Sequence, residues 1–236
     1  MRTRQAVVVM AALAVLGTSA CSVGPAGSAG HPTPSARRSL RAGLLTQDRL
    51  PQGFELLSAQ VDSTTTGAPH QPASTDSLAQ MPCSELGVES FMTVHAPPLE
   101  DVAVGLQRNP PDETDDGWFG QESLDRYAPG RSAEVMAAVR AAAQRCASFT
   151  STLAGGTQVQ ETASVTAAGV AADDGLVLRI VSAYPGEADP FVTETGFVRE
   201  GDVILMVQQV VAQKPSSGVT TVLAPAVAAY RAAAAG

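Results

Sequence analysis

The chain has 236 residues, of which 44% are hydrophobic and only 4% aromatic, so its core must consist mostly of Val, Leu and Ala side chains. Its 15 Lys and Arg residues against 23 Asp and Glu residues give a net charge of −8. An acidic chain has no electrostatic basis for binding phosphates, and we therefore exclude nucleic acid as a partner.

Residues 1–20 have the pattern of a secretion signal peptide. Arg2 and Arg4 form a short positive segment, and residues 6–16 form an apolar run. This run is shorter than the roughly 20 residues that a membrane-spanning helix needs, so we expect a cleaved signal. Its removal leaves 13 basic against 23 acidic residues, a net charge of −10.

Cys21 directly follows the small residues 17–20. This order resembles the lipobox of bacterial lipoproteins, with Thr18 where the family usually carries Leu. The resemblance implies cleavage before Cys21, acylation of that residue by chains such as palmitate, and anchoring at the extracytoplasmic face of the cell membrane. The alternative is an ordinary signal cut near Ala20, which would leave a free thiol.

Residues 21–39 are rich in Gly, Pro, Ala and Ser and have no apolar periodicity. Such a segment cannot bury enough surface to offset the entropy of ordering it, so we interpret it as a flexible tether. Residues 40–236 then form one domain.

The first half of this domain is predicted to contain both helices and strands. The strongest element is a helix at 132–146, where Val135, Val139 and Ala142 recur at helical spacing and Ser132 is placed to cap the first turn. The other predicted elements are a short helix at 40–50, a strand at 54–61, a loop at 62–80, a helix beginning at Pro82, and paired strands at 100–108 and 117–127.

The second half is predicted to be mainly strands. A hairpin turn is expected at residues 200–202, and the last helix contains Pro225, which is tolerated only near the first turn. The predicted elements are edge strands at 158–162 and 164–168, strands at 175–184, 191–199 and 203–211, and a helix at 219–234. The sum is an α+β fold, a twisted antiparallel sheet packed with about four helices.

Cys83 and Cys146 remain as an even pair in an exported protein, and we predict a disulfide between them. A bond between residues 63 positions apart is expected to stabilise the fold by roughly 4 kcal/mol. Two free buried thiols are the alternative. A metal or redox pair is not expected, because the sequence has no CxxC motif.

No residue pattern predicts catalysis. The three histidines, His31, His70 and His95, fall in no metal-ligand spacing, and no GxSxG motif occurs. Residues 112–117 resemble the start of a calcium loop, but Ser123 stands at the twelfth position, where a bidentate Glu is needed. We therefore interpret this stretch as an acidic turn and expect no enzyme activity, no cofactor and no metal.

Trp118, Tyr127 and Tyr184 are the candidates for the wall of a ligand-binding cleft, because large aromatic side chains with a polar atom are common in such walls. The alternative, which is the more common one for aromatic side chains in strands, is that each of them is a core residue.

The order of the predicted elements carries a family resemblance. A short helix ends in Pro51 and Gly53, the segment at Pro82 and Cys83 precedes a strand pair, and the hairpin at 196–204 precedes a terminal helix. Over residues 40–235 this order resembles the PknH-like extracellular sensor domain of actinobacteria, found on receptor Ser/Thr kinases and on stand-alone lipoproteins. The resemblance implies a non-catalytic, surface-exposed domain whose cleft binds an unidentified ligand.

The family often carries a second disulfide across its last hairpin. At the approximate positions this chain has the apolar residues Val192 and Val210. The bond between Cys83 and Cys146 is therefore the only crosslink that we expect.

Two functions fit the sequence. The first is a surface lipoprotein that binds or senses a small molecule or a lipid. The second is a structural lipoprotein that contacts other envelope proteins. A deep apolar cavity would favour the first, and a flat exposed apolar patch would favour the second.

Overall fold

The computed structural model describes residues 39–57, 76–88, 91–214 and 217–235. All of them belong to one compact unit, Arg38–Gly236. The predicted signal peptide, Cys21 and nearly all of the tether lie outside the described residues, as does most of the predicted loop at 62–80.

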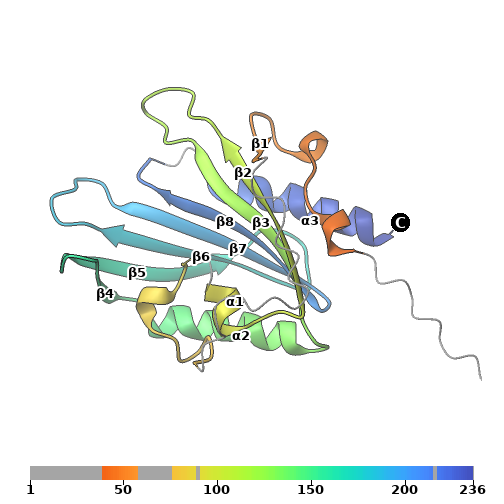
Figure 1. Ribbon diagram of the computed structural model, residues 1–236, viewed down its shortest axis with the longest axis horizontal. Coiled ribbons are helices and arrows are strands. Elements are labelled where there is room, and N and C mark those ends of the chain that lie inside the picture. The colour runs from red at the N-terminus through yellow and green to blue at the C-terminus, as the bar shows by residue number, and fades with distance from the viewer. Residues whose placement is uncertain (1–38, 58–75, 89–90, 215–216, 236) are drawn as a thin grey trace, which may run out of the picture. The chain divides into compact units, whose positions relative to one another are not determined.

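An eight-stranded antiparallel sheet forms the centre of this unit, in the order β1-β2-β3-β8-β7-β6-β5-β4 (Figure 1). Two runs of sequential strands, β1 to β3 and β4 to β8, are joined by the pairing of β3 with β8. The strands are β1 (Glu55–Leu56), β2 (Glu100–Arg108), β3 (Trp118–Arg126), β4 (Phe149–Thr152), β5 (Gln158–Ala167), β6 (Asp174–Ala183), β7 (Phe191–Glu200) and β8 (Val203–Ala212).

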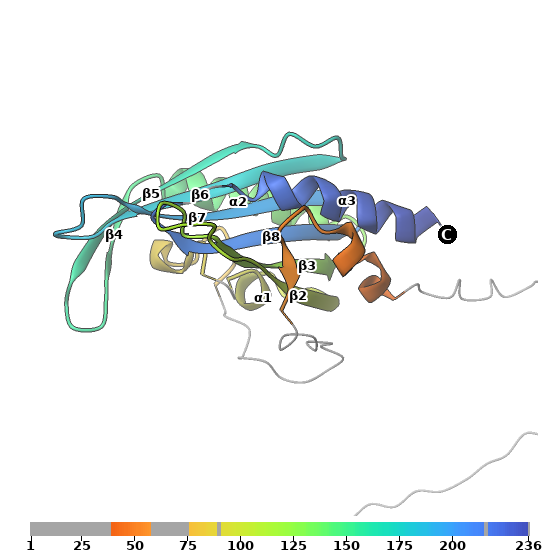
Figure 2. The same ribbon diagram turned by 90° about the horizontal axis from the view of Figure 1, so that it is seen from above.

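Helices cover both faces of the sheet (Figures 1 and 2). One face packs against α1 (Phe91–His95) and α2 (Arg131–Arg145), and the other packs against α3 (Thr220–Ala235) and the 3₁₀ turn η1 (Leu40–Gly43). Two further 3₁₀ turns are η2 (Gln47–Arg49) and η3 (Cys83–Glu85). The described residues contain no helix that is long and apolar enough to cross a membrane.

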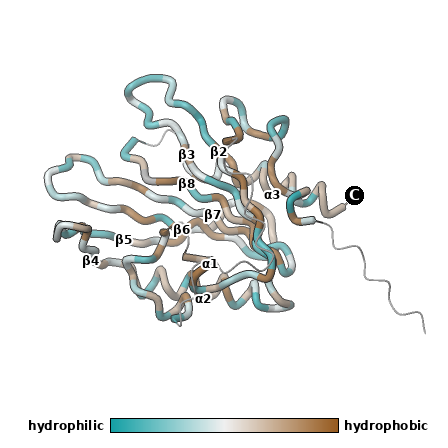
Figure 3. The backbone as a smooth tube through the Cα atoms, in the orientation of Figure 1, coloured by the Kyte–Doolittle hydropathy of each residue, from teal (hydrophilic) through white to brown (hydrophobic). Residues whose placement is uncertain are grey.

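Strand alternation explains why the unit has two hydrophobic cores. In β8, Val203, Leu205 and Val207 pack in the core beneath α3, whereas Ile204 and Met206 pack in the core beneath α1 and α2. Successive side chains of a strand point to opposite faces, so a strand covered on both faces is apolar throughout. Figure 3 shows hydrophobic residues along β6, β7 and β8, and mostly hydrophilic residues in the loops beyond their ends.

The strands of the sequence prediction are largely confirmed. The predicted pair at 100–108 and 117–127 is β2 and β3, and the predicted hairpin is β7 and β8. The two predicted edge strands are one continuous strand, β5, and β4 was not predicted. The strand predicted at 54–61 is described only as β1, which pairs with β2 over two residues, and residues 58–61 lie outside the described part of the chain.

The helices are fewer than the predicted four, because only three described segments form α-helices. The helix predicted at 40–50 is instead the two 3₁₀ turns η1 and η2. The helix predicted from Pro82 is broken into η3 and α1, since Gly87 has a φ of +82° that a continuous helix excludes. Pro225 is the sixth residue of α3 and therefore lies inside the helix, beyond the first turn near which it was expected.

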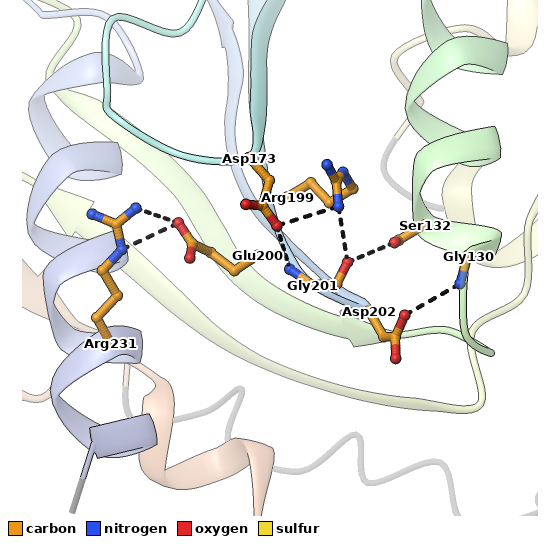
Figure 4. A network of polar contacts seen from close by, with 8 residues as sticks. All are labelled: Gly130, Ser132, Asp173, Arg199, Glu200, Gly201, Asp202 and Arg231. Atoms are coloured by element: carbon orange, nitrogen blue, oxygen red, sulfur yellow. Dashed lines mark hydrogen bonds and ion pairs between the residues drawn. The ribbon is translucent and has the colours of Figure 1, made fainter.

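The turn between β7 and β8 ties three other elements together (Figure 4). Ser132 of α2 donates its hydroxyl hydrogen to the carbonyl oxygen of Gly201 at 2.8 Å, so it does not cap its own helix as predicted. The Gly201 N–H donates to Asp173 of the loop between β5 and β6 at 2.9 Å. Arg231 of α3 donates its Nε–H to Glu200 at 3.1 Å. One turn therefore fixes α2 and α3 to the same end of the sheet.

The predicted disulfide is confirmed. Cys83 and Cys146 are bonded, with 5.4 Å between their Cα atoms. Cys146 is fully buried at the end of α2, where it continues the stripe of Val135, Val139 and Ala142. The bond joins η3 to the end of α2, and Arg145 donates hydrogen bonds to Cys83 Sγ at 3.3 Å and to nearby backbone carbonyls. The two segments therefore form one rigid corner of the fold.

Candidate functional site

Strand β3 carries polar side chains into both hydrophobic cores. Its alternation sends Trp118, Glu122 and Leu124 toward the core beneath α3, and Ser123 and Asp125 toward the core beneath α1 and α2. Glu122 and Asp125 are only 0% and 1% exposed. A buried carboxyl group without a countercharge costs free energy, so both positions need a physical explanation.

Glu122 has one satisfied oxygen and one free oxygen. Its Oε2 accepts the backbone N–H of Leu45 at 2.8 Å, while its Oε1 has no hydrogen-bond partner among the described residues. Burial raises the pKa of Glu122 to about 8, and the Leu45 N–H opposes this shift only in part. At neutral pH the carboxyl group is therefore mostly protonated and uncharged.

Two unpartnered donors lie on the same face as Glu122. The side-chain N–H groups of Trp118 (Nε1) and Gln209 (Nε2) are buried and have no acceptor among the described residues. Gln209 lies directly opposite Gly120 in the pairing of β3 with β8, which makes it a diagonal neighbour of Glu122. We call Trp118, Glu122 and Gln209 the Glu122 cluster.

Gly120 makes room for this cluster. A Cβ atom at Gly120 would lie 2.7 Å from the ring of Trp118 and would clash with the carbonyl oxygen of Gln208. Since only glycine lacks that atom, the Trp118 ring can lie over the strand between its own position and that of Glu122.

No protein-family model matches the chain, and no curated protein matches it either.

A row of polar side chains connects the Glu122 cluster with the surface. Gln209, Glu194 and Arg179 are direct neighbours across β8, β7 and β6. The Arg179 side chain is 48% exposed and donates to Glu194 Oε1 at 3.1 Å, and Glu194 Oε2 accepts the N–H of Val219 near the start of α3 at 3.2 Å. The row thus runs from exposed Arg179 to the buried cluster.

Residues 44–57, which follow η1 and include β1, pack over the Glu122 cluster on the face of the sheet that α3 also covers. Leu44, Leu45 and Phe54 are buried in the core beneath α3, and Phe54 makes an edge contact with Trp118 at 5.4 Å between ring centres. Gln47 holds this segment in shape, because it donates to the Phe54 carbonyl at 3.2 Å and accepts the Leu56 N–H at 3.1 Å. We call residues 44–57 the cover segment.

A second buried polar group lies on the opposite face of β3. Burial, together with the charge of the neighbouring Asp101, raises the pKa of Asp125 to about 7, while the Ser123 hydroxyl opposes the shift. Burial, followed by the charge of Asp125, also raises the pKa of Tyr127, whose hydroxyl has no partner among the described residues. The hydroxyl group of Ser123 on this face is likewise buried and has no hydrogen-bond partner among the described residues.

The three predicted cleft residues do not lie together. Trp118 joins the Glu122 cluster, whereas Tyr127 is buried in the core on the other face of the sheet. Tyr184 is half-buried and contacts Phe191 at 5.0 Å between ring centres, beyond the end of β6. Strand alternation therefore separates Trp118 from Tyr127, and the three candidates lie in three different places.

The carboxylates of the acidic turn accept backbone N–H groups, both from the turn itself and from the segment that follows β8. Asp112 accepts the N–H of Thr114 at 2.8 Å, and Asp116 accepts the N–H groups of Gln213 and Lys214 at 2.8 Å and 2.6 Å. Within the described ranges, no three His, Cys, Asp or Glu side chains are grouped as metal ligands would be. These carboxylates therefore act as structural acceptors for two loops.

The sequence offered a signal for the Glu122 cluster that the aromatic criterion missed. Glu122 stands on the same face of a strand as Trp118 and Leu124, so a charged residue interrupts an apolar alternation. Such an interruption indicates either an error of register or a buried polar site. The position of Gln209 beside Glu122 could not be predicted in the same way, because the two residues become neighbours only through the pairing of β3 with β8.

Proposed function

We propose that the chain is an exported lipoprotein, anchored through Cys21, whose outer domain binds a small uncharged ligand at the Glu122 cluster. The observation that carries this proposal is the presence of three buried, unpartnered polar atoms on one face of two neighbouring strands, Trp118 Nε1, Glu122 Oε1 and Gln209 Nε2.

Leaving these atoms without partners is costly. Each buried donor or acceptor that lacks a hydrogen bond costs about 1–3 kcal/mol, and stable proteins leave few of them. A ligand hydroxyl or carbonyl group beside Glu122 would accept from the Trp118 and Gln209 N–H groups and would bond with the Glu122 carboxyl group. The rings of Phe54 and Trp118 would contact the apolar part of the same molecule.

The ligand is expected to be uncharged. Glu122 is mostly protonated at neutral pH, and the two unpartnered donors on the same face of the sheet, Trp118 and Gln209, are themselves neutral. A charged ligand would lose its hydration without gaining a countercharge inside the cluster. The cluster also contains no nucleophile beside a base, which favours binding over catalysis.

Two features support export and anchoring. The residues before Cys21 have the lipobox order, and the bond between Cys83 and Cys146 is typical of proteins that fold in an oxidising compartment. In the sequence, the tether at 21–39 is followed by η1 and then by the cover segment.

Native mass spectrometry of the protein purified from its own cells tests the ligand proposal. We expect the wild-type chain to carry a small molecule, and the isosteric Glu122→Gln variant to carry less than a tenth of it. Glu134→Gln is the matched control, because Glu134 is exposed on α2 and should retain the ligand. Equal occupancy in the Glu122→Gln variant, or no adduct in the wild type, would contradict the proposal.

One observation favours the second function, contact with envelope proteins. Phe119 and Val210 are 44% and 53% exposed. Phe119 precedes Gly120 in β3 and Val210 follows Gln209 in β8, so both lie next to the paired Gly120 and Gln209. Exposed apolar neighbours of this kind are common in protein interfaces. A Phe119→Ser and Val210→Ser double variant that no longer retains an envelope protein in a pull-down, but still carries the small molecule, would show that both functions coexist.

A further inference from the structure

Strand β5 leaves part of one sheet edge open. β4 pairs with it only up to Glu161, and the next backbone contact on that side is the N–H of Ala163, which donates to Ala147 at 3.3 Å. Bonding groups alternate along an antiparallel strand, so Val165 and Ala167 direct their N–H and C=O groups to the same outer side as Ala163. None of the described residues pairs with those outer groups. In Figure 2, β5 and its turn to β6 lie at the upper border of the ribbon.

Within the part of the chain that the structure describes, this open edge has none of the usual protection against pairing. Residues 162–167 read TASVTA and contain no charge and no proline. Proteins commonly protect a free edge with charged side chains, prolines, bulges or a covering element. The opposite edge of the same sheet is protected in this way, since β1 and β2 carry Glu55, Glu100 and Asp101.

We propose that the open edge of β5 pairs with the same edge of a second copy of this chain, in antiparallel orientation about a twofold axis at Thr166. Val165 of each copy then lies opposite Ala167 of the other, and each such pair exchanges both of its backbone hydrogen bonds. The sheet runs continuously through both copies.

A second copy is the occupant that fits the geometry of this edge. The free backbone N–H and C=O groups belong to Val165 and Ala167, which are symmetric about Thr166. The pairing cannot extend to Ala163, because the N–H of Ala163 already donates to Ala147. A symmetric stretch is its own complement, as an isologous interface requires. The axis also places one Thr166 beside the other, and Thr pairs are favourable cross-strand neighbours. The net charge of −8 opposes association of two copies, but the edge itself is uncharged.

Charge placed at the axis tests this pairing. The full chain carrying Cys21→Ser, in density-matched detergent, is expected to sediment at equilibrium as a dimer. Thr166→Asp and Thr166→Lys should each weaken the dimer by about fivefold or more, because like charges then face each other. An equimolar mixture of the two variants should restore it. Thr162→Asp is the matched control, since Thr162 is exposed on the same strand but away from the axis, and it should leave the dimer unchanged.

Crosslinking gives an independent measurement of the register. In the Cys21→Ser background, Thr166→Cys should form an intermolecular disulfide on mild oxidation, and Thr162→Cys should not. The pairing is overturned if the wild type sediments as a monomer, if Thr166→Asp dimerises as strongly as the wild type, or if Thr162→Cys crosslinks as efficiently as Thr166→Cys.

Discussion

Leu45 donates its backbone N–H to Glu122 Oε2 at 2.8 Å, although 77 positions separate the two residues in the sequence. This bond fastens the cover segment to the one carboxyl group that is buried beneath it. The other oxygen of the same carboxyl group has no partner among the described residues. A ligand that bonds to Glu122 therefore contacts the residue that holds the cover segment in place.

Stability should fall as the pH rises. Glu122 and Asp125 have pKa values raised to about 8 and about 7, so between the normal carboxyl pKa and these values the folded state binds more protons than the unfolded state. The free energy of unfolding is therefore highest near the normal carboxyl pKa, decreases as the pH rises toward 7 and 8, and levels off above these values. Thermal unfolding should show a Tm that decreases from about pH 5 to about pH 8 and changes little above it.

Two variants test whether Glu122 and Asp125 cause this pH dependence. Glu122→Gln and Asp125→Asn should each flatten the decrease, because an amide does not ionise. Glu134→Gln, at an exposed position, should follow the wild-type curve. A Glu122→Gln variant with the full wild-type slope would show that Glu122 does not change its protonation state on unfolding.

Removal of the disulfide should destabilise the domain strongly. The double variant Cys83→Ala and Cys146→Ala is expected to lose about 2–5 kcal/mol in the free energy of unfolding, since the bond closes a loop between residues 63 positions apart. Urea titration of the variant measures the loss. Cys21→Ser is the control and should unfold at the wild-type midpoint. An unchanged midpoint in the double variant would contradict a structural role for the bond.

Gly120→Ala should be among the most damaging single substitutions in the sheet. The added Cβ would clash with the Gln208 carbonyl oxygen and with the Trp118 ring, so we expect a loss of about 2 kcal/mol or more, or failure to fold. Gly186→Ala is the comparison. Gly186 has a φ of +88° but open space around it, so its substitution should cost only about 1 kcal/mol of backbone strain. Equal stabilities of the two variants in urea titration would show that the contact at Gly120 relaxes without cost.

Replacement of the proposed anchor should release the protein. In membrane fractionation of the producing cells, the wild type is expected in the membrane fraction and the Cys21→Ser variant in the soluble extracytoplasmic fraction. The reason is that multiple acyl chains are the only attachment that the lipobox order implies. A Cys21→Ser variant that remains with the membrane as fully as the wild type would place the attachment elsewhere.

Much of the fold could be predicted because its signals are local. The apolar stripe of α2 and the turn at Gly201 lie within short windows, and both predictions are confirmed. The helix predicted from Pro82 was wrong because Gly87 adopts a positive φ, which the spacing of apolar residues does not reveal. Serine is a common helix-capping residue, but the Ser132 hydroxyl donates to the carbonyl oxygen of Gly201 instead. Tertiary contacts decide between hydrogen-bond partners that are equivalent in the sequence.

The candidate site could be predicted only in part, because it depends on long-range pairing. Trp118 was selected for its ring, and it lies on the same face of the sheet as Glu122. Glu122 and Gln209 become neighbours only through the pairing of β3 with β8, which brings together residues 87 positions apart. No local pattern contains that information.

Fluorescence of Trp118 tests the central proposal most directly, because the chain contains a single tryptophan. The probe is the small-molecule fraction released by denaturing wild-type protein purified from its own cells, added to refolded, ligand-free protein. If the ligand binds at the Glu122 cluster, the emission should change saturably, the Glu122→Gln variant should respond at least tenfold more weakly, and Glu134→Gln should respond as the wild type does. An adduct that rebinds by mass spectrometry without any change in Trp118 emission would place the ligand elsewhere and contradict the proposed site.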